Sequence, residues 1–581
     1  MSMNNNHRKN IIVFFLVCLC CDAIFAKLRT EQEVMSIAEK VVSTGTLSSS
    51  FKKRIISYVD LRIAAHSDSY YVINTGNVGF VIVSTDDELP ELLGYCESGN
   101  YNEKKMPPAL QMWLNNYDIE YQAWRNSGSN LFNVKVGQQS RNALKLIDPL
   151  LSTKWGQSFP FNNYCPRDCR DSLCPTGCTT TAIAQIMKFW QWPKQGVGSA
   201  SLEYVCKEDS TYKKSLFVDM DSIPYQWNNM VDYYGLGTLL SKGITTSEQQ
   251  EAVARLMYHI AIAEQVHFTS DGTGLNFAEI RNKAFPALFS HFCYSDDIHV
   301  FVKDYCQSDS LEIILYDELM SRRPIFVLGT DLSKGGHAFV CDGYDNAFFH
   351  FNWGWYGLGD GWFRLSALNP SVLTSSFSLN SFVQFFTGIR PSTYSNPIKH
   401  EGQILLADSI AIVPYMDYED SYLADIFNIT VAGIREYIDE FSVALYSNDS
   451  DNIVQLLFPE NMPFPVNIPN FFYGYKNANM KMEIQLKHAL PGGDYRIAAV
   501  YKNKKGEWTP VSLPNGRKYI NFRKQWGVVI GGPVSVYTIS GQFVTSIREW
   551  KGLDEIKHLN LPKGVYLIKQ GNNVLKFSNY E

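Results

Sequence analysis

The residues best suited to chemistry are a cysteine and a histidine that lie far apart in the sequence. Cys178 ends the run Pro175-Thr176-Gly177-Cys178 and leads into residues 179–190, whose apolar side chains recur at helical spacing before Pro193. We therefore expect Cys178 at the N-terminus of a helix. The unpaired backbone amides there favour the thiolate, which predicts a pKa below the value of about 8.5 of a free cysteine.

A thiolate nucleophile works best beside a base, and histidine is the side chain that serves this role near neutral pH. The candidate is His337, which follows Gly335-Gly336 and begins the apolar run 337–340. It lies 159 residues after Cys178 (337 − 178), near the separation of roughly 130–150 residues in papain-type enzymes. Gly336 is expected to let the backbone of a substrate come close.

Two further segments offer the groups that such a pair needs. Asn352-Trp353-Gly354-Trp355 begins fifteen residues after His337 (352 − 337) and supplies a residue to orient the imidazole. Either Asn352 or Trp353 can fill this position, and the choice stays open. Upstream, the amide of Gln157 and the backbone N–H of Cys178 are expected to bind a tetrahedral oxyanion.

Taken singly, a cysteine or a histidine is more often structural than catalytic. The motifs around Cys178 and His337 favour the catalytic interpretation of this pair. The other histidines considered lack a comparable glycine-rich approach, and we interpret them as structural: His267, His291, His299 and His350.

Four cysteines crowd into a short segment, at positions 165, 169, 174 and 178. A tetrahedral zinc site is one interpretation of four thiolates. The irregular spacing and the expected export favour instead a disulfide among Cys165, Cys169 and Cys174, which would brace the loop before the nucleophile. Nine of the 12 cysteines lie outside the predicted signal, so at least one thiol should stay free or pair outside the chain.

These motifs, taken in their order, resemble the streptopain family of cysteine peptidases. The matching segments are 175–178, 184–188, 335–340, 352–355, 360–365 and 367–370, and the resemblance extends over roughly residues 30–391. It implies a papain-like α+β fold, zymogen activation and broad cleavage of proteins. It also implies Cys178 and His337 as the catalytic pair and Gln157 at the oxyanion hole. The expected mechanism needs neither a cofactor nor a metal ion.

A glycine-rich segment, Ser270-Asp271-Gly272-Thr273-Gly274, lies between the two halves of the predicted pair. We expect this segment to border the substrate cleft. Ser270 and Gly272 are therefore candidate substrate-binding residues.

The first 26 residues are typical of a bacterial secretory signal. Basic residues at 7–9 precede an apolar run at 11–19 and a small residue at Ala26, so cleavage is expected near Lys27. The run is shorter than the roughly 20 residues of a membrane anchor. Cys20 and Cys21 leave lipoprotein attachment open. The expected location is outside the cell or on its surface.

The rest of the chain divides into four predicted parts. Residues 27–144 read as a small α+β unit, an inhibitory propeptide, with the polar stretch 127–142 as the site of precursor cleavage. Residues 145–391 mix helical runs with apolar strands and form the predicted peptidase body. Short alternating segments predict a β-sandwich at 392–525 and a second small β domain at 526–581.

The last part has a resemblance of its own. Residues 536–542 and 561–566 resemble the C-terminal sorting domains of bacterial type IX secretion cargo. This resemblance implies export or attachment to the cell surface, with no part in catalysis.

Length and composition limit the remaining function classes. At 581 residues the chain should hold several domains of about 100–200 residues each. A net charge of −6 offers no basic field for nucleic acid, and neither a Gly-x-Ser-x-Gly elbow nor a His-Glu-x-x-His pair occurs. The expected partners are protein or peptide substrates and the chain's own propeptide. The alternative is a surface protein whose β domains bind host or glycan ligands and whose peptidase body is inactive.

Overall fold

The computed structural model describes most of the chain beyond the predicted signal. The described residues are 27–44, 60–76, 79–126, 144–236, 244–331, 335–368, 383–414, 421–433, 438, 440–457, 480–486, 490, 493–503, 505–524, 533–549, 559, 561–570 and 573–579. The predicted signal (1–26) and the predicted cleavage stretch (127–142) lie outside these residues. Among the described helices, none combines the length and the apolar character needed to cross a membrane.

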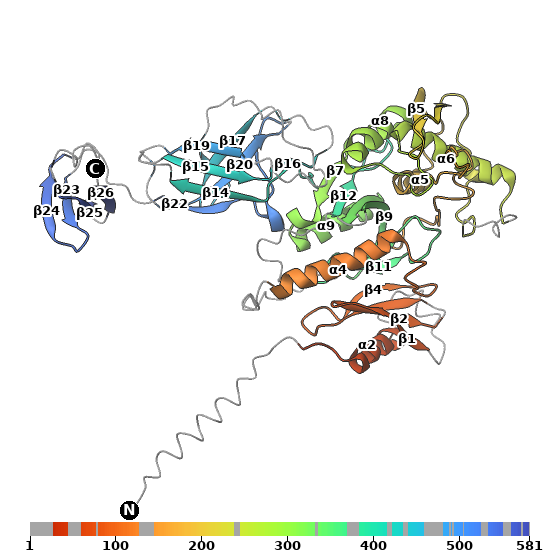
Figure 1. Cartoon of the computed structure of the whole chain (residues 1–581), viewed down its shortest axis with the longest axis horizontal. Helices are drawn as coiled ribbons and strands as arrows, with labels where there is room; N and C mark the ends of the chain where they lie inside the picture. Colours follow the sequence, from red (N-terminus) through yellow and green to blue (C-terminus); the bar gives the residue numbers. More distant parts are fainter. Residues whose placement is uncertain are drawn as a thin grey trace, which may run out of the picture.

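An N-terminal α+β unit precedes the body of the protein (Figure 1). Four antiparallel strands pair in sequence order, with α2 against one face and α4 against the other. The elements are α2 (Glu31–Thr44), β1 (Leu61–His66), β2 (Tyr70–Thr75), β3 (Phe80–Ser84), β4 (Leu92–Cys96) and α4 (Pro108–Asn126).

The central body combines a group of helices with a sheet (Figure 1). Its helices are α5 (Cys178–Trp190), α6 (Ser247–Glu264), α7 (Phe277–Glu279), α8 (Phe285–Phe292) and α9 (Ser308–Met320). Its strands are β5 (Ser199–Val205), β6 (Lys213–Asp219), β7 (His299–Val302), β8 (Ile325–Asp331), β9 (Gly335–Asp345), β10 (Phe348–Asn352), β11 (Gly361–Phe363) and β12 (Val383–Thr387).

One continuous sheet joins the N-terminal unit to this body. The strand order is β1-β2-β3-β4-β11-β10-β9-β8-β12-β7. The junction is the antiparallel pair of β4 with β11, in which Tyr95 lies opposite Trp362 and Gly94 opposite Phe363. A Cβ atom on Gly94 would lie 2.8 Å from the Phe363 ring, so this close pairing requires glycine. The N-terminal unit therefore extends the edge of the body's own sheet, as in β-strand addition.

Two hydrophobic cores lie on opposite faces of this sheet. Successive residues of β9 alternate between them, because side chains along a strand point to opposite faces. Ala338 and Val340 pack with α5, α6 and α8 in the first core. Phe339 and Cys341 pack with α4 and α9 in the second, where the Trp113 ring lies 6.0 Å from the Phe339 ring. Strand β9 is thus held between α5 and the N-terminal unit.

The C-terminal part is built from β-strands. A sandwich has its own core and consists of β13 (Leu405–Leu406), β14 (Ser409–Pro414), β15 (Ser421–Phe427), β16 (Thr430–Val431), β17 (Phe441–Ser447), β18 (Ile453–Leu456), β19 (Met480–Gln485), β20 (Gly493–Lys502), β21 (Trp508–Pro510) and β22 (Ile520–Lys524). A four-stranded sheet follows, with β23 (Val534–Thr538), β24 (Phe543–Ile547), β25 (Gly564–Gln570) and β26 (Asn573–Asn579). The predicted fold class, with α+β propeptide, α+β body and C-terminal β domains, is confirmed.

Candidate active site

Cys178 is the first residue of α5, as the sequence predicted. The preceding Gly177 has φ 94°, and a Cβ there would lie 2.8 Å from the carbonyl oxygen of Thr273. Glycine is needed at this position because other residues rarely adopt this backbone and none would fit against Thr273. The chain can therefore turn sharply into the helix and present the thiol at its N-terminus.

The structure brings the histidine-bearing strand to this thiol. The sulfur of Cys178 accepts a hydrogen bond from the backbone N–H of Ala338, the residue after His337. His337 is half-buried and lies opposite Gly329 in the antiparallel pair of β9 with β8. The strand that carries His337, 159 positions from Cys178 in the chain (337 − 178), thus reaches the thiol, and the pairing of the two side chains stays a prediction.

The electrostatic state of Cys178 differs from the prediction. The residue keeps partial exposure, but protein atoms surround its thiol, and this burial raises the pKa of Cys178 above its ordinary value. The backbone N–H groups of Ala338, Thr179 and Cys178 itself lower the pKa, by less than burial raises it. The prediction of a lowered pKa is therefore wrong for this form of the chain, in which the N-terminal unit is in place.

Gln157 lies beside the loop that leads to the nucleophile. Its carbonyl oxygen accepts the backbone N–H of Thr176 at 2.9 Å, and the residue is half-buried. The neighbouring Trp155 donates its backbone N–H to Gln185 of α5 at 3.3 Å. The Gln157 backbone is thus held beside Thr176, two residues before Cys178, and its side chain as oxyanion donor stays a prediction.

Asn352 is buried and braces the site through three hydrogen bonds. Its Oδ1 accepts from Gln185 Nε2 and from the backbone N–H of Gly354, each at 3.0 Å, and its Nδ2 donates to the carbonyl of Thr153 at 2.7 Å. The Asn352 amide therefore ties helix α5 to the segment that carries Gln157.

Trp353 lies on the other face of the sheet. Its Nε1 donates to the carbonyl of Gly359 at 2.7 Å, and its ring packs 4.8 Å from the Phe339 ring. Which of Asn352 and Trp353 orients His337 stays a prediction, because their described bonds run to other groups.

The predicted substrate-binding residues lie at two places around the nucleophile. Ser270 accepts a hydrogen bond from the Arg170 guanidinium at 3.1 Å, and Gly272 is exposed in the loop whose Thr273 touches Gly177. Gly336 is exposed directly before His337. Contact of these residues with a substrate stays a prediction.

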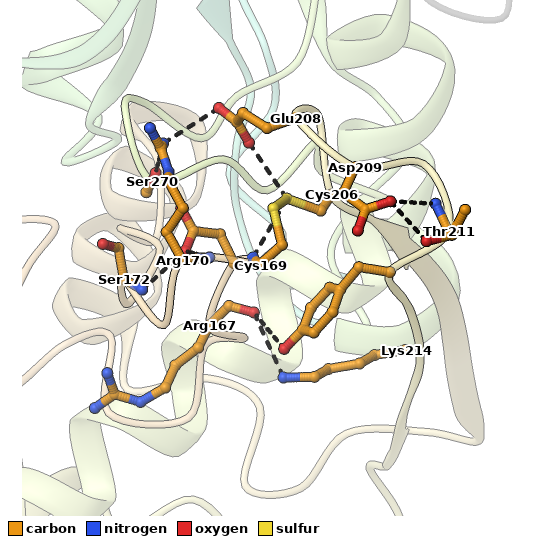
Figure 2. The surroundings of a disulfide bond; sticks show 12 residues. Arg167, Cys169, Arg170, Ser172, Cys206, Glu208, Asp209, Thr211, Lys214 and Ser270 are labelled. Carbon is orange, nitrogen blue, oxygen red and sulfur yellow. Dashed lines mark hydrogen bonds and ion pairs between the residues drawn. A yellow bond between two sulfur atoms is a disulfide. The ribbon is translucent and has the colours of Figure 1, made fainter.

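The disulfide prediction is wrong in its pairing. Cys169 bonds to Cys206, whereas Cys165 and Cys174 are free and buried. Figure 2 shows the bond beside Arg170, which also reaches Glu208 and Ser270. The pairing could not be derived from local spacing, because Cys206 arrives with the hairpin of β5 and β6, 37 residues along the chain.

The zinc interpretation of the four cysteines is excluded by the same bond, because Cys169 has no free thiolate to offer. Within the described ranges, one group of side chains stands close enough together to share a metal ion, Cys169 with Cys206 and Glu208. Two of its three ligand atoms are the disulfide sulfurs.

The structural interpretation of His350 agrees with its surroundings. The ring is largely buried, and its Nδ1 lies 2.6 Å from the carboxylate of Asp342. Burial lowers the pKa of His350, but the surrounding carboxylates, Asp342 foremost with Asp360 and Glu97, together raise it above its ordinary value. The ring also lies 5.0 Å from that of Trp362, on the strand that joins the N-terminal unit.

Gln185 had no predicted role, although its side-chain amide connects three parts of the site. Gln185 Oε1 accepts from the Thr153 hydroxyl at 2.9 Å and from the Trp155 backbone, while Nε2 donates to Asn352. A signal was present, because Gln185 is a polar residue inside the apolar run of the predicted helix.

A cysteine at a helix start, a histidine-bearing strand against it and an N-terminal unit built into the same sheet are features of a cysteine peptidase in its precursor form. Comparison with known families agrees: residues 155–363 match the model of the Peptidase C10 family, and residues 26–121 match that of the Spi protease inhibitor. The body of the chain, residues 155–363, is thus similar to the Peptidase C10 family. The predicted resemblance to streptopain, the enzyme class and the inhibitory propeptide are confirmed.

Several relatives are similar over the same region. The thiol protease/hemagglutinin PrtT of Porphyromonas gingivalis is 28% identical over 366 residues, which cover 61% of this chain and 40% of that protein. Streptopain of Streptococcus pyogenes is 28% identical over 337 residues, covering 55% of this chain and 80% of streptopain. A solved fragment of prointerpain A from Prevotella intermedia is 26% identical, covers 58% of this chain and all of that fragment, and gives a TM-score of 0.47. The chain thus spans less than half the length of PrtT.

Proposed function

We propose that this chain is a secreted cysteine endopeptidase that hydrolyses peptide bonds of proteins through a thioester intermediate. The observation that carries the proposal is the position of the Cys178 thiol. It lies at the start of α5 and is hydrogen-bonded to the neighbour of His337. The match of residues 155–363 to the Peptidase C10 family supports the reaction class.

The proposed mechanism assigns one role to each group. His337 takes the proton of Cys178, and the sulfur attacks the carbonyl carbon of the scissile peptide bond. The Gln157 amide and the backbone N–H of Cys178 hold the oxyanion that forms. His337 then gives its proton to the leaving amine, and water hydrolyses the thioester. These side chains supply all the proton transfers that the two steps require.

The contacts of α4 suggest how the propeptide holds the enzyme latent. The side chain of Met112 lies against Gly329, the residue opposite His337, and leaves no room for a Cβ there. The Trp113 ring packs against Phe339, two residues after His337. We infer that α4 fixes the strand that carries the base, and that this strand adjusts when the propeptide leaves.

Export and surface attachment are part of the proposal. The basic and apolar character of residues 7–19 supports secretion, and the resemblance of residues 536–542 and 561–566 to sorting domains supports a role of the last sheet in export or attachment. Detection of the peptidase body on intact cells, and its loss from the surface when residues 526–581 are deleted, would test this.

Casein hydrolysis tests the enzymatic part. Full-length protein, before and after removal of the propeptide, is compared with Cys178→Ala and with Cys293→Ser, which changes a half-buried free thiol outside the site. We expect activity after propeptide removal, and a loss of at least about a thousandfold in Cys178→Ala but not in Cys293→Ser. A folded protein without activity in any form would favour the binding-protein alternative.

A further inference from the structure

We propose that Tyr356 is a positioning residue for catalysis, which holds the oxyanion segment at Gln157 in place through its phenol hydroxyl. The inference rests on the function proposed above and adds a residue to its machinery. Tyr356 follows directly after the Asn352–Trp355 run, and neither the motifs nor the spacing assigned it a role.

Tyr356 binds the segment 155–158 at several successive peptide groups. Its backbone N–H donates to the carbonyl of Trp155 at 2.9 Å. Its hydroxyl accepts the backbone N–H of Ser158 at 2.8 Å and also that of Gln157. The Tyr356 side chain thus fixes the backbone N–H groups of Gln157 and Ser158. They lie on either side of the Gln157 side chain, which is proposed to bind the oxyanion.

Packing fixes the ring of Tyr356 as tightly as the hydrogen bonds fix its hydroxyl. The ring lies directly over Gly156, where a Cβ atom would overlap its carbon atoms. It also lies 6.1 Å from the ring of Phe161 and packs against the first hydrophobic core. Glycine at position 156 is therefore needed to let the phenol approach the Gln157 backbone.

The backbone of Tyr356 has an unfavourable conformation, whose energetic cost these contacts must offset. Its φ of 60° lies in the left-handed region, which disfavours residues with a Cβ and favours glycine. Strained conformations of this kind persist where the surrounding structure imposes them, and they are common at functional sites. Here the bonds to the Gln157 segment supply the constraint.

The opposite side of the same peptide segment is tied to the nucleophile. The carbonyl of Gln157 accepts the N–H of Thr176, two residues before Cys178. The backbone of Gln157 is therefore hydrogen-bonded on one side to the nucleophile loop and on the other side to Tyr356. Without the hydroxyl, the Gln157 and Ser158 amides would lose their acceptor, and the backbone that carries the Gln157 side chain would be held less firmly.

Two kinds of reagent separate a positioning role from a general structural one. A peptide aldehyde adds to the Cys178 sulfur and forms a hemithioacetal, whose oxygen occupies the oxyanion position. Iodoacetamide alkylates the same sulfur by displacing iodide, without forming an oxyanion. A defect in the oxyanion segment should weaken the first reaction and leave the second unchanged.

The experiment compares four variants of the full-length protein after propeptide removal. Tyr356→Phe deletes the hydroxyl, Gln157→Ala deletes the oxyanion amide, and the double variant combines them. Tyr234→Phe is the matched control, because the Tyr234 hydroxyl also accepts a backbone N–H, that of Val231 at 3.1 Å, within the same core.

We expect Tyr356→Phe to lower kcat about tenfold with little change in KM, and to raise the aldehyde inhibition constant by a similar factor. The iodoacetamide rate should stay at the wild-type value, as should all three readouts in Tyr234→Phe. In the Gln157→Ala background, Tyr356→Phe should have no further effect, because the group that it positions is gone.

Aldehyde affinity and kcat at the wild-type level in folded Tyr356→Phe would overturn the inference, as would an undiminished effect in the Gln157→Ala background. If Tyr356→Phe does not fold, Gly156→Ala decides, because the added methyl displaces the ring; wild-type aldehyde affinity there would equally overturn the inference. An active Cys178→Ala protein would instead remove the proposed function itself, so the two failures are distinguishable.

Discussion

Glu264 is a buried acid close to the nucleophile. It ends helix α6, is 1% exposed, and accepts a hydrogen bond from the Thr180 hydroxyl at 2.7 Å, two residues after Cys178 on α5. Burial raises the pKa of Glu264 to about 8, although the bond from Thr180 lowers it. The carboxyl group is therefore protonated at neutral pH, and the start of α5 has no buried negative charge beside it.

This raised pKa predicts a specific dependence of stability on pH. The folded state holds the Glu264 proton more tightly than the unfolded state, whose pKa is about 4.3. The stabilisation is complete below that value and is lost as the pH rises to about 8. The uncharged side chain in Glu264→Gln should not show this loss. The free energy of unfolding of the variant, relative to that of the wild type, should therefore rise by up to roughly 4 kcal/mol between pH 5 and pH 8.

Urea unfolding at several pH values would measure this difference. Glu203→Gln, at an exposed site, is the control and should show no such trend. A wild-type to Glu264→Gln difference that stays constant from pH 5 to pH 8 would contradict the assignment of a protonated Glu264.

At the scale of residues, the sequence revealed the groups that belong to local motifs. Cys178 was predictable because its helix start is encoded by the residues around it, and His337 because two glycines precede an apolar strand. The roles of Gln185, Tyr356 and Glu264 depend on contacts between segments distant in the chain. Burial, which reverses the predicted pKa shift of Cys178, is likewise a property of the assembled fold.

At the scale of elements, the Cys169–Cys206 disulfide ties the loop before α5 to the hairpin of β5 and β6. Next to it, Arg170 reaches Ser270 and Glu208 (Figure 2). The bond therefore braces both the nucleophile loop and the segment that carries the predicted substrate-binding residues.

Breaking this disulfide should lower stability more than activity. The bond closes a loop of 37 residues, for which chain entropy gives about 4 kcal/mol. Cys169→Ala, Cys206→Ala and the double variant should each lose a similar amount in urea unfolding, because any one change breaks the bond. A double variant much less stable than either single variant, or single variants as stable as wild type, would contradict this interpretation.

The pairing of β4 with β11 makes the propeptide part of the enzyme's sheet. A side chain at Gly94 would meet the Phe363 ring at 2.8 Å and the Trp362 carbonyl at 2.9 Å. Gly94→Val should therefore open the junction, so that the uncleaved precursor hydrolyses a small peptide at least about tenfold faster than the wild-type precursor.

The control for this change is Gly99→Asn. Gly99 has φ 73°, which asparagine tolerates, and no atom lies within 4 Å of its Cβ position. The Gly99→Asn precursor should stay as latent as wild type. Full latency in Gly94→Val would show that the sheet junction is dispensable for inhibition.

At the scale of the whole molecule, the sandwich docks on the peptidase body through a buried arginine. Arg281 is 3% exposed and donates to the carbonyls of Val431 at 2.7 Å and Gly433 at 2.9 Å. Burial lowers the pKa of Arg281 to about 10, so the group stays charged and holds both carbonyls at neutral pH.

Replacing this arginine should therefore matter only when the sandwich is present. Arg281→Leu should destabilise the full chain by about 2–3 kcal/mol, because two buried carbonyls lose a charged donor. In a chain ending before residue 392 the same change should cost less than about 0.5 kcal/mol. Urea unfolding of wild type and Arg281→Leu, each as the full chain and as the shorter chain, would measure this coupling. An equal loss of unfolding free energy in both chains would contradict it.

The order of the parts could be predicted from the sequence, since changes in apolar periodicity separate them. The continuous sheet could not, because the register of β4 on β11 joins residues more than 250 positions apart (362 − 95). Strand register between distant segments is set by tertiary packing rather than by local pattern. For the same reason, the contact of Arg281 with Val431 and Gly433 could not be predicted from the sequence.

The central claim is that Cys178 and His337 form the reactive pair and that the propeptide keeps them unreactive. The pH dependence of Cys178 alkylation by iodoacetamide, in the precursor and after propeptide removal, tests it most directly. We predict that the precursor reacts only at alkaline pH, because burial raises the pKa of Cys178, and that the released enzyme reacts down to acidic pH unless His337 is replaced by alanine. Identical profiles in the precursor, the released enzyme and His337→Ala would contradict the account.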